Sequence, residues 1–193
     1  MKVNIRRINE WDAPAVLKIY SPYAGTVSAQ DKEPPSLSEM IQRIDRYTYG
    51  YGWLVCEIDG TPAGFCYVTE HHLAPENPFL LDFYVYVKKE YQRRRVGTAL
   101  FYLLKRILEY GNRQKLYISR TRCDDSAAVF LEHLGFQQKK DSDDAQGRRW
   151  EYLLSPENTA AETITKPYLI ENKAYEKERE TAQNLVRESR SAF

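Results

Sequence analysis

The sequence contains little cysteine, no long apolar run and almost no net charge. Its three cysteines (Cys56, Cys66 and Cys123) are odd in number and widely spaced, which excludes a disulfide framework and a zinc site, so no metal is expected. No apolar run approaches the roughly 20 residues of a membrane helix. Residues 1–9 alternate apolar and polar side chains, unlike a secretory signal. These absences predict a cytoplasmic protein with reduced cysteines and no membrane partner.

The two signs of charge nearly cancel. Lys and Arg together number 28 and Asp and Glu 27, which gives a formal net charge of +1. Nucleic acids attract an excess of positive charge, so this balance argues against a nucleic-acid partner. Hydrophobic residues make up 42% of the 193 residues and charged residues 28%, a composition typical of a globular domain.

The side-chain pattern switches repeatedly between the period of strands and that of helices. Strands are predicted at Val3–Ile8, Trp53–Ile58, Pro62–Glu70, Phe79–Val87, Lys115–Arg120, Phe136–Lys139 and Arg148–Leu154. Five helices are predicted. The first follows Asp12 as its cap, and the second begins at Ser36, which forms a capping box with Glu39. The others run from Val96 to a stop at Gly111, after Asp124 or Asp125 as a cap, and over Glu171–Ser189. This order predicts an α/β fold, in which a mixed, mostly antiparallel sheet carries helices on both faces.

The chain changes character after Leu154. Residues 1–154 are predicted to form the domain, and residues 155–193 to add a C-terminal helical extension. In the charged helix Glu171–Ser189, four of the apolar residues lie close to one helical face: Tyr175, Ala182, Leu185 and Val186. Isolated helices need packing to persist in water, so this face is predicted to dock on the chain's own domain or on a second copy.

One carboxylate lies in the most apolar strand of the chain, Phe79–Val87. Asp82 loses water there, and a buried charge is costly unless partners compensate it. Such a carboxylate suits a general base, because an alkyl amine is mostly protonated at neutral pH and cannot act as a nucleophile until it loses a proton. A structural Asp82, bonded to backbone at a strand irregularity, is the alternative. Tyr84 shares the face of Asp82, where core packing is the alternative to a catalytic role.

The segment that follows this strand is basic, contains a glycine and leads directly into a helix. The first N–H groups of a helix have no intrahelical partner, and the helix dipole adds positive charge there, so a turn at this point can bind a phosphate. Arg93, Arg94 and Arg95 add full charges. The segment Gln92–Ala99 is therefore predicted to bind a pyrophosphate. A solvated helix start, and a nucleic-acid contact through the arginines and Tyr91, are the alternatives.

The letters QRRRVG at Gln92–Gly97 resemble the pyrophosphate-binding turn of the GNAT superfamily of N-acetyltransferases. Other segments resemble its phosphinothricin N-acetyltransferase-like branch, in the same order: Ile19-Tyr20, Pro34–Leu37, Arg43-Ile44, Trp53–Val55 and Asp82–Val87. The resemblance covers residues 3–154 and implies a GNAT-like fold. It also implies acetylation of a primary amine by direct transfer, with acetyl-CoA as co-substrate.

The resemblance further implies roles for individual residues. Asp82 is the implied general base. Tyr84, which shares its face of the strand, is a candidate to protonate the leaving thiolate, unless the thiolate needs no acid. The implied cofactor-binding residues are Val85, Tyr86, Val87, Gln92, Arg93, Arg94, Arg95, Val96, Gly97, Thr98, Ala99, Asp124 and Ser126. The implied acceptor is a small amine or an amino-acid-like compound, with a protein N-terminus or lysine left open. A homodimer is a further expectation, because relatives in this branch are often dimers.

Three positions depart from the superfamily's pattern. Arg95 replaces the first glycine of the turn, and Asp124 replaces an asparagine. Leu131, predicted to be a core residue, replaces a tyrosine that serves as general acid in many relatives. The departures leave open a second reading, in which a catalytically degenerate GNAT domain serves as a CoA-binding or protein-binding module.

Two further features stay open at this stage. His71 and His72 end a predicted strand, so their side chains are expected on opposite faces, where they make poor joint metal ligands. One of them lines the acceptor pocket, or both belong to a plain loop. The branch's substrate-binding arginine is absent here, so phosphinothricin is not carried over as the substrate. Cys123 is predicted to be a buried structural residue rather than a nucleophile.

Overall fold

The computed structural model describes residues 1–193 apart from 27–28, 49–51, 122–124, 140–147, 157–171 and 190–193. The strands are β1 (Val3–Arg7), β2 (Trp53–Ile58), β3 (Thr61–Glu70), β4 (Leu80–Val87), β5 (Lys115–Thr121), β6 (Gln137–Lys139) and β7 (Arg148–Leu153). The helices are α1 (Ala13–Tyr20), α2 (Leu37–Thr48), α3 (Val96–Tyr110), α4 (Asp125–Leu134) and α5 (Asn172–Glu188). Each predicted strand and helix is present, with small shifts at the ends.

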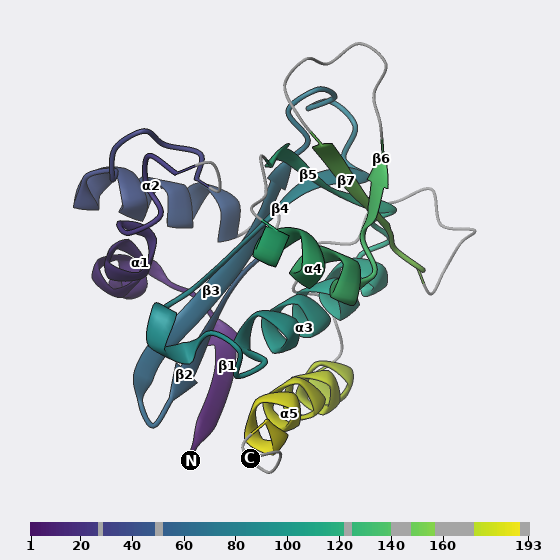
Figure 1. Ribbon diagram of the computed structural model, residues 1–193. Helices are drawn as coiled ribbons and strands as arrows, with labels where there is room; N and C mark the ends of the chain where they lie inside the picture. Colours follow the sequence, from purple (N-terminus) through teal and green to yellow (C-terminus); the bar gives the residue numbers. More distant parts are fainter. Residues whose placement is uncertain (27–28, 49–51, 122–124, 140–147, 157–171, 190–193) are drawn as a thin grey trace.

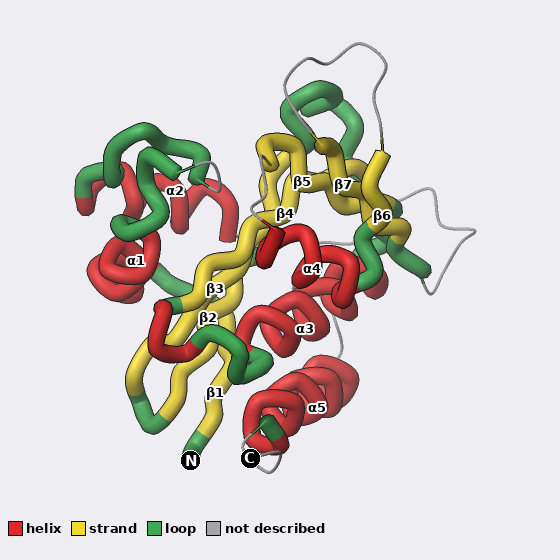
Figure 2. The backbone as a smooth tube through the Cα atoms, viewed as in Figure 1, coloured by secondary structure: helices red, strands yellow, loops and turns green. Residues whose placement is uncertain are grey.

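The described strands form one sheet in the order β1-β2-β3-β4-β5-β7-β6 (Figures 1 and 2). Neighbouring strands run antiparallel, except that β4 and β5 run parallel. The predicted mixed, mostly antiparallel sheet is confirmed. Its single parallel pair lies at the centre of the order, and there the candidate site is found.

Helices cover both faces of the sheet, as predicted (Figure 1). On the face covered by α1 and α2, the core is rich in aromatic rings. It contains Tyr20, Trp53, Phe65, Tyr67 and Tyr86. On the opposite face, α3, α4 and α5 pack on a largely aliphatic core. Successive side chains of a strand alternate between faces, so β4 places Asp82 on the aromatic side and its neighbours Leu81 and Phe83 on the aliphatic side.

The C-terminal helix α5 lies against α3 and the edge strand β1 (Figure 1). Its Ala182 and Val186 are fully buried in the aliphatic core. Gln183 accepts a hydrogen bond from the backbone N–H of Ile5 at 3.2 Å, which occupies a donor that an exposed edge strand leaves unpaired. Docking of this helix on the chain's own domain is therefore confirmed, whereas the division of the chain at residue 154 stays a prediction.

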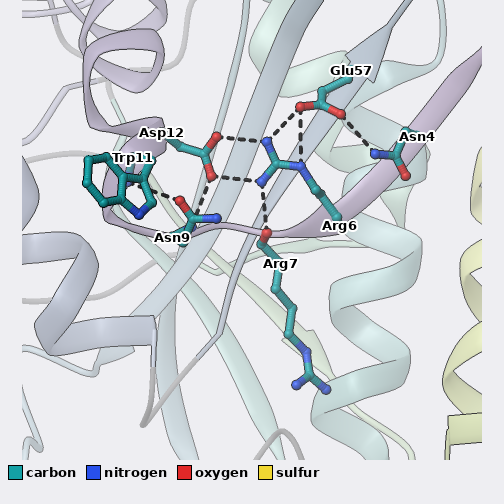
Figure 3. A network of polar contacts seen from close by, with 7 residues as sticks. All are labelled: Asn4, Arg6, Arg7, Asn9, Trp11, Asp12 and Glu57. Atoms are coloured by element: carbon teal, nitrogen blue, oxygen red, sulfur yellow. Dashed lines mark hydrogen bonds and ion pairs between the residues drawn. The ribbon is translucent and has the colours of Figure 1, made fainter. Parts of the chain in front are cut away.

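The start of α1 is held differently from the prediction. Asp12 makes no side-chain cap on α1. Its carboxylate instead receives two hydrogen bonds of 2.8 Å from the Arg6 guanidinium, which also binds Glu57 at 2.6 Å (Figure 3). Burial acts to raise the pKa of Asp12, but the hydrogen bonds from Arg6 and from the Asn9 N–H, together with the Arg6 charge, lower the pKa below its usual value. The pair joins the start of α1 to β1 and β2.

The start of α2 follows the predicted capping box. The N–H of Glu39 donates to the Ser36 hydroxyl at 3.3 Å, and the N–H of Ser36 donates to the Glu39 carboxylate at 2.7 Å.

Among the helices in the described part of the chain, none combines the length and apolarity needed to cross a membrane.

Candidate functional site

The parallel strands β4 and β5 separate partway along their length. They pair from Leu80 with Lys115 to Asp82 with Tyr117, and in the described residues no pairing between them continues beyond that point. The carbonyl of Val87 accepts hydrogen bonds from the Tyr23 hydroxyl at 2.5 Å and from the Gln92 amide at 3.3 Å, so its peptide groups point away from β3. Backbone groups alternate along a strand, so those of Val85 point the same way, into the fork.

Asp82 lies at the point where the fork opens. Asp82 as a whole is only 2% exposed. His71 Nδ1 lies 2.7 Å from Oδ1, and His72 Nδ1 lies 3.0 Å from Oδ2, which also accepts the backbone N–H of His72 at 3.2 Å. We call these three residues the Asp82 cluster. Both oxygens of the buried carboxylate are thus satisfied by the turn after β3.

The expectation that His71 and His72 point to opposite faces is wrong. Strand β3 ends at Glu70, so both histidines lie in the turn and the alternation of a strand no longer applies to them. The register of the β3–β4 hairpin, with Thr69 opposite Asp82, brings the turn back over the carboxylate. That register is the signal that sequence reasoning missed.

The two histidines differ in exposure. The His71 side chain is 4% exposed and stacks on the Tyr117 ring, with centroids 4.0 Å apart. The His72 side chain is 44% exposed. Arg149 and Lys115 place their cations 4.9 and 5.5 Å from the centre of the Tyr117 ring, so positive charge borders the cluster. His71 is therefore the buried, fixed histidine of the cluster, and His72 is the accessible one.

Each residue of the Asp82 cluster also offers one atom that could ligate a metal ion, and these three atoms lie within 4.8 Å of one another. Each histidine nitrogen, however, lies at hydrogen-bond distance from a different oxygen of one carboxylate. These distances fit a carboxylate that accepts a hydrogen bond from each imidazole, an arrangement that needs no ion.

Aromatic rings line the sheet next to Asp82. Tyr84 is half-buried and stacks on Tyr67, with ring centroids 4.8 Å apart, and Tyr67 stacks on Trp53 at 4.2 Å. The ring of Tyr86 is buried beside Tyr20 at 5.0 Å. Burial raises the pKa of Tyr67 and Tyr86 well above the usual value, so both rings stay neutral. Of these rings only that of Tyr84 is partly exposed, and its catalytic role stays a prediction.

The turn before α3 has an unusual backbone. Arg93 and Arg95 both have positive φ, of 62° and 57°, in the left-handed region where a side chain is unfavourable. Arg95 is the N-cap of α3, and its side chain makes no capping hydrogen bond. The first N–H groups of this helix are therefore left for an external acceptor, as an anion site requires.

The predicted turn residues divide into two groups: Gln92, Arg93 and Arg95 are exposed and Arg94 and Thr98 half-buried, whereas the other three are buried. Val96 and Ala99 are buried in the core, so only their backbone can reach a ligand. Gly97 is also buried, and a Cβ on it would lie 2.9 Å from the ring of Phe130 on α4. This glycine is required for the close contact between α3 and α4, a role that the sequence did not reveal.

The remaining predicted residues are placed only in part. Ser126 lies in the first turn of α4, whereas Asp124 and Cys123 lie outside the described residues. Leu131 is 4% exposed, which confirms that it is a core residue. Burial raises the pKa of the Cys56 thiol to about 12, so this cysteine stays a thiol and is a poor nucleophile.

Two comparisons place the chain among known proteins. A model of the acetyltransferase (GNAT) domain family matches residues 49–138. Phosphinothricin N-acetyltransferase of Streptomyces viridochromogenes is 31% identical over 111 residues, which are 56% of this chain and 61% of that protein. The enzyme of the same name from Alcaligenes faecalis is 30% identical over 129 residues, 66% of each chain. The matches thus span less than two thirds of these relatives' lengths.

The fold has its own match among solved structures. A GNAT superfamily phosphinothricin acetyltransferase from Sinorhizobium meliloti, solved with AcCoA, superposes with a TM-score of 0.73. The match covers 88% of this chain and 97% of that chain, at 20% sequence identity. Residues 49–138 of this chain therefore match the acetyltransferase (GNAT) domain family, and the chain has the fold of a solved GNAT acetyltransferase.

Proposed function

We propose that the protein is an acetyl-CoA-dependent N-acetyltransferase that acylates a primary amine by direct transfer. The observation that carries the proposal is the fork between β4 and β5, with the Asp82 cluster at its base and the uncapped N-terminus of α3 beyond its open end. One part of this arrangement suits a proton acceptor and the other suits a phosphate.

Acetyl-CoA fits the open edge of β4 and the turn that follows it. Its pantetheine arm would lie along the backbone from Val85 to Val87, where the peptide groups of Val85 and Val87 point away from β3 and Tyr86 lies between them. Its pyrophosphate would bind at residues 92–99, where N–H groups lack helical partners and three arginines add charge. Asp124 and Ser126 complete the proposed cofactor-binding set. When bound, the thioester supplies the acetyl group.

The acceptor is a small amine or an amino-acid-like compound on the aromatic face next to Asp82. The named relatives are phosphinothricin acetyltransferases, which supports a small amine as substrate. An ammonium must lose a proton before its nitrogen can attack, so a base is required close to the thioester. The Asp82 cluster is the proposed source of that base, and Tyr84 is a neighbouring catalytic candidate. The domain division at residue 154 and a homodimer belong to the same proposal.

A screen of amines tests the function. Purified protein would be mixed with saturating acetyl-CoA and with phosphinothricin, free amino acids, a polyamine or a peptide with a free N-terminus, and release of CoA thiol would be followed. We expect thiol release with at least one class. The degenerate-domain alternative predicts CoA bound in native mass spectrometry but no release with any amine, and that result would overturn the proposal.

A further inference from the structure

The carboxylate of Asp82 is poorly placed to take a proton from a substrate. Its side chain is only 3% exposed, and both oxygens accept hydrogen bonds from the turn after β3. The turn after β3 covers the carboxylate, so a substrate ammonium could not reach it without moving that turn. The group through which the cluster meets a substrate is therefore a different one.

Hydrogen bonding fixes the proton positions within the cluster. An ionised carboxylate is an acceptor only, so each histidine that bonds to it through Nδ1 must carry its proton on Nδ1. In a neutral imidazole the lone pair then lies on Nε2. In His72 that atom belongs to a side chain that is 44% exposed, whereas the His71 side chain is 4% exposed and stacked on Tyr117.

We propose that His72 Nε2, oriented by Asp82, is the atom that removes the proton from the acceptor amine. Asp82 and His71 are then positioning residues: Asp82 fixes the tautomer of His72 and stabilises the imidazolium that forms, and buried His71 holds the other oxygen of Asp82. This inference rests on the proposed acetyltransferase function. The proton acceptor is then His72, in the turn after β3, and not Asp82 on β4.

The proposed step balances as follows. The ammonium transfers one proton to His72 Nε2, and the nitrogen lone pair forms the C–N bond with the carbonyl carbon of acetyl-CoA. The C–S bond breaks and its electron pair stays on sulfur. The second proton of the nitrogen neutralises the thiolate, and the imidazolium releases its proton to water. The products are the amide, CoA thiol and one proton.

Several charged and titratable groups border the cluster. They are His71 on the same turn, Glu70 on β3 with Arg46 of α2, Tyr117 and Lys115 on β5, and Arg149 and Glu151 on β7. Lys115 and Arg149 lie on the His71 side, near Tyr117. Asp82 is the anion in direct contact with both rings.

The first test uses the amine with the greatest thiol release in the screen above. His72→Gln keeps a side chain able to bond to Asp82 but removes the base, so kcat should fall by about 10²- to 10⁴-fold while the Kd of acetyl-CoA holds within twofold. The acid limb of the kcat–pH profile should disappear, and added imidazole should restore activity to His72→Ala. His133→Gln, on the exposed side of α4, is the matched control and should leave kcat unchanged.

The outcomes separate this inference from the proposed function. Thiol release by the wild type together with near-wild-type kcat in His72→Gln would overturn the role of His72 and leave the function intact. A raised KM for the amine with an unchanged pH profile would make His72 a binding residue and overturn it too. Loss of activity with a chelator, restored by a divalent metal, would overturn it in favour of a metal site. No release by the wild type would overturn both.

A spectroscopic measurement reads the geometry without any substrate. Long-range ¹⁵N–¹H NMR of the full chain distinguishes the two tautomers of a neutral imidazole. We expect His71 and His72 to carry the proton on Nδ1, and His133 to show the mixture typical of an exposed histidine. In Asp82→Asn the preference of His72 should weaken. A His72 with its proton on Nε2 in the wild type would overturn the proposal.

Discussion

The two ends of β4 differ in how their polar groups are hydrogen-bonded. At Asp82, a carboxylate that is almost fully buried is satisfied by two side chains and a backbone N–H. At the other end, the turn into α3 leaves Arg93 and Arg95 with positive φ and leaves the first helical N–H groups without a side-chain cap. One end is satisfied internally, and the other is left for a ligand.

The difference follows from the chemistry proposed at each end. A proton acceptor works when its charge and tautomer are fixed in advance, so its hydrogen bonds must be complete before a substrate arrives. A phosphate site works when its donors are unpaired until the phosphate binds. Each substitution below removes one property from one end and asks whether the other end is affected.

The largest effect is expected at the Asp82 end. Asp82→Asn keeps the size but removes the charge, and its NH₂ group would face an N–H of a histidine, so His72 loses its fixed tautomer. We expect kcat to fall by about 10²- to 10⁴-fold, with the Kd of acetyl-CoA unchanged. Thiol-release kinetics and a calorimetric titration with acetyl-CoA measure the two quantities.

Asp45→Asn is the matched control for that experiment, because Asp45 is exposed on α2. It should leave both constants as in the wild type. If Asp82→Asn turns over at a near-wild-type rate from mildly acidic to mildly alkaline pH, Asp82 is a structural residue and the contrast between the two ends has no catalytic meaning.

An intermediate effect is expected where α3 meets α4. Gly97→Ala places a Cβ 2.9 Å from the ring of Phe130, so we expect the free energy of unfolding to fall by about 1–3 kcal/mol. A smaller partner in Gly97→Ala with Phe130→Leu should recover part of the loss. Urea unfolding of the four proteins in this cycle measures the coupling. Equal stability of Gly97→Ala and the wild type would return Gly97 to the role of a ligand-contacting residue.

Sequence reasoning reached the parts of this site that depend on local pattern. The apolar run Phe79–Val87 identified β4 and its single carboxylate, and the basic segment at 92–99 identified the turn before α3. The Ser36 and Glu39 capping box was also readable, because all of its bonds lie within one turn. Each of these features is set by residues that are neighbours in the chain.

The parts it missed depend on contacts between distant segments. His71 and His72 converge on Asp82 only because β3 stops at Glu70 and pairs with β4 in one register. Gln183 reaches the N–H of Ile5 across 178 residues of sequence. The packing of Gly97 on Phe130 depends on how closely two helices approach. Pattern and spacing carry no information on these distances.

The smallest effect is expected from the backbone strain of the turn. A side chain in the left-handed region costs roughly 1–2 kcal/mol, and glycine avoids this at an entropic cost of about 0.5–1 kcal/mol. Arg95→Gly should therefore stabilise the protein by up to about 1 kcal/mol, which raises Tm by about 2–4 °C in a chain of this size. Thermal unfolding by circular dichroism measures the shift.

Arg94→Gly provides the comparison within the same turn. Arg94 is not among the residues with positive φ, and its guanidinium lies 5.5 Å from the centre of the Tyr91 ring. Glycine there gains nothing from the backbone and loses that contact, so Tm should fall slightly. A higher Tm with weaker acetyl-CoA binding in Arg95→Gly would mean that the strained arginine is retained for the phosphate. Equal shifts in the two variants would show that no strain is stored at Arg95, and the contrast between the ends of β4 would then rest on Asp82 alone.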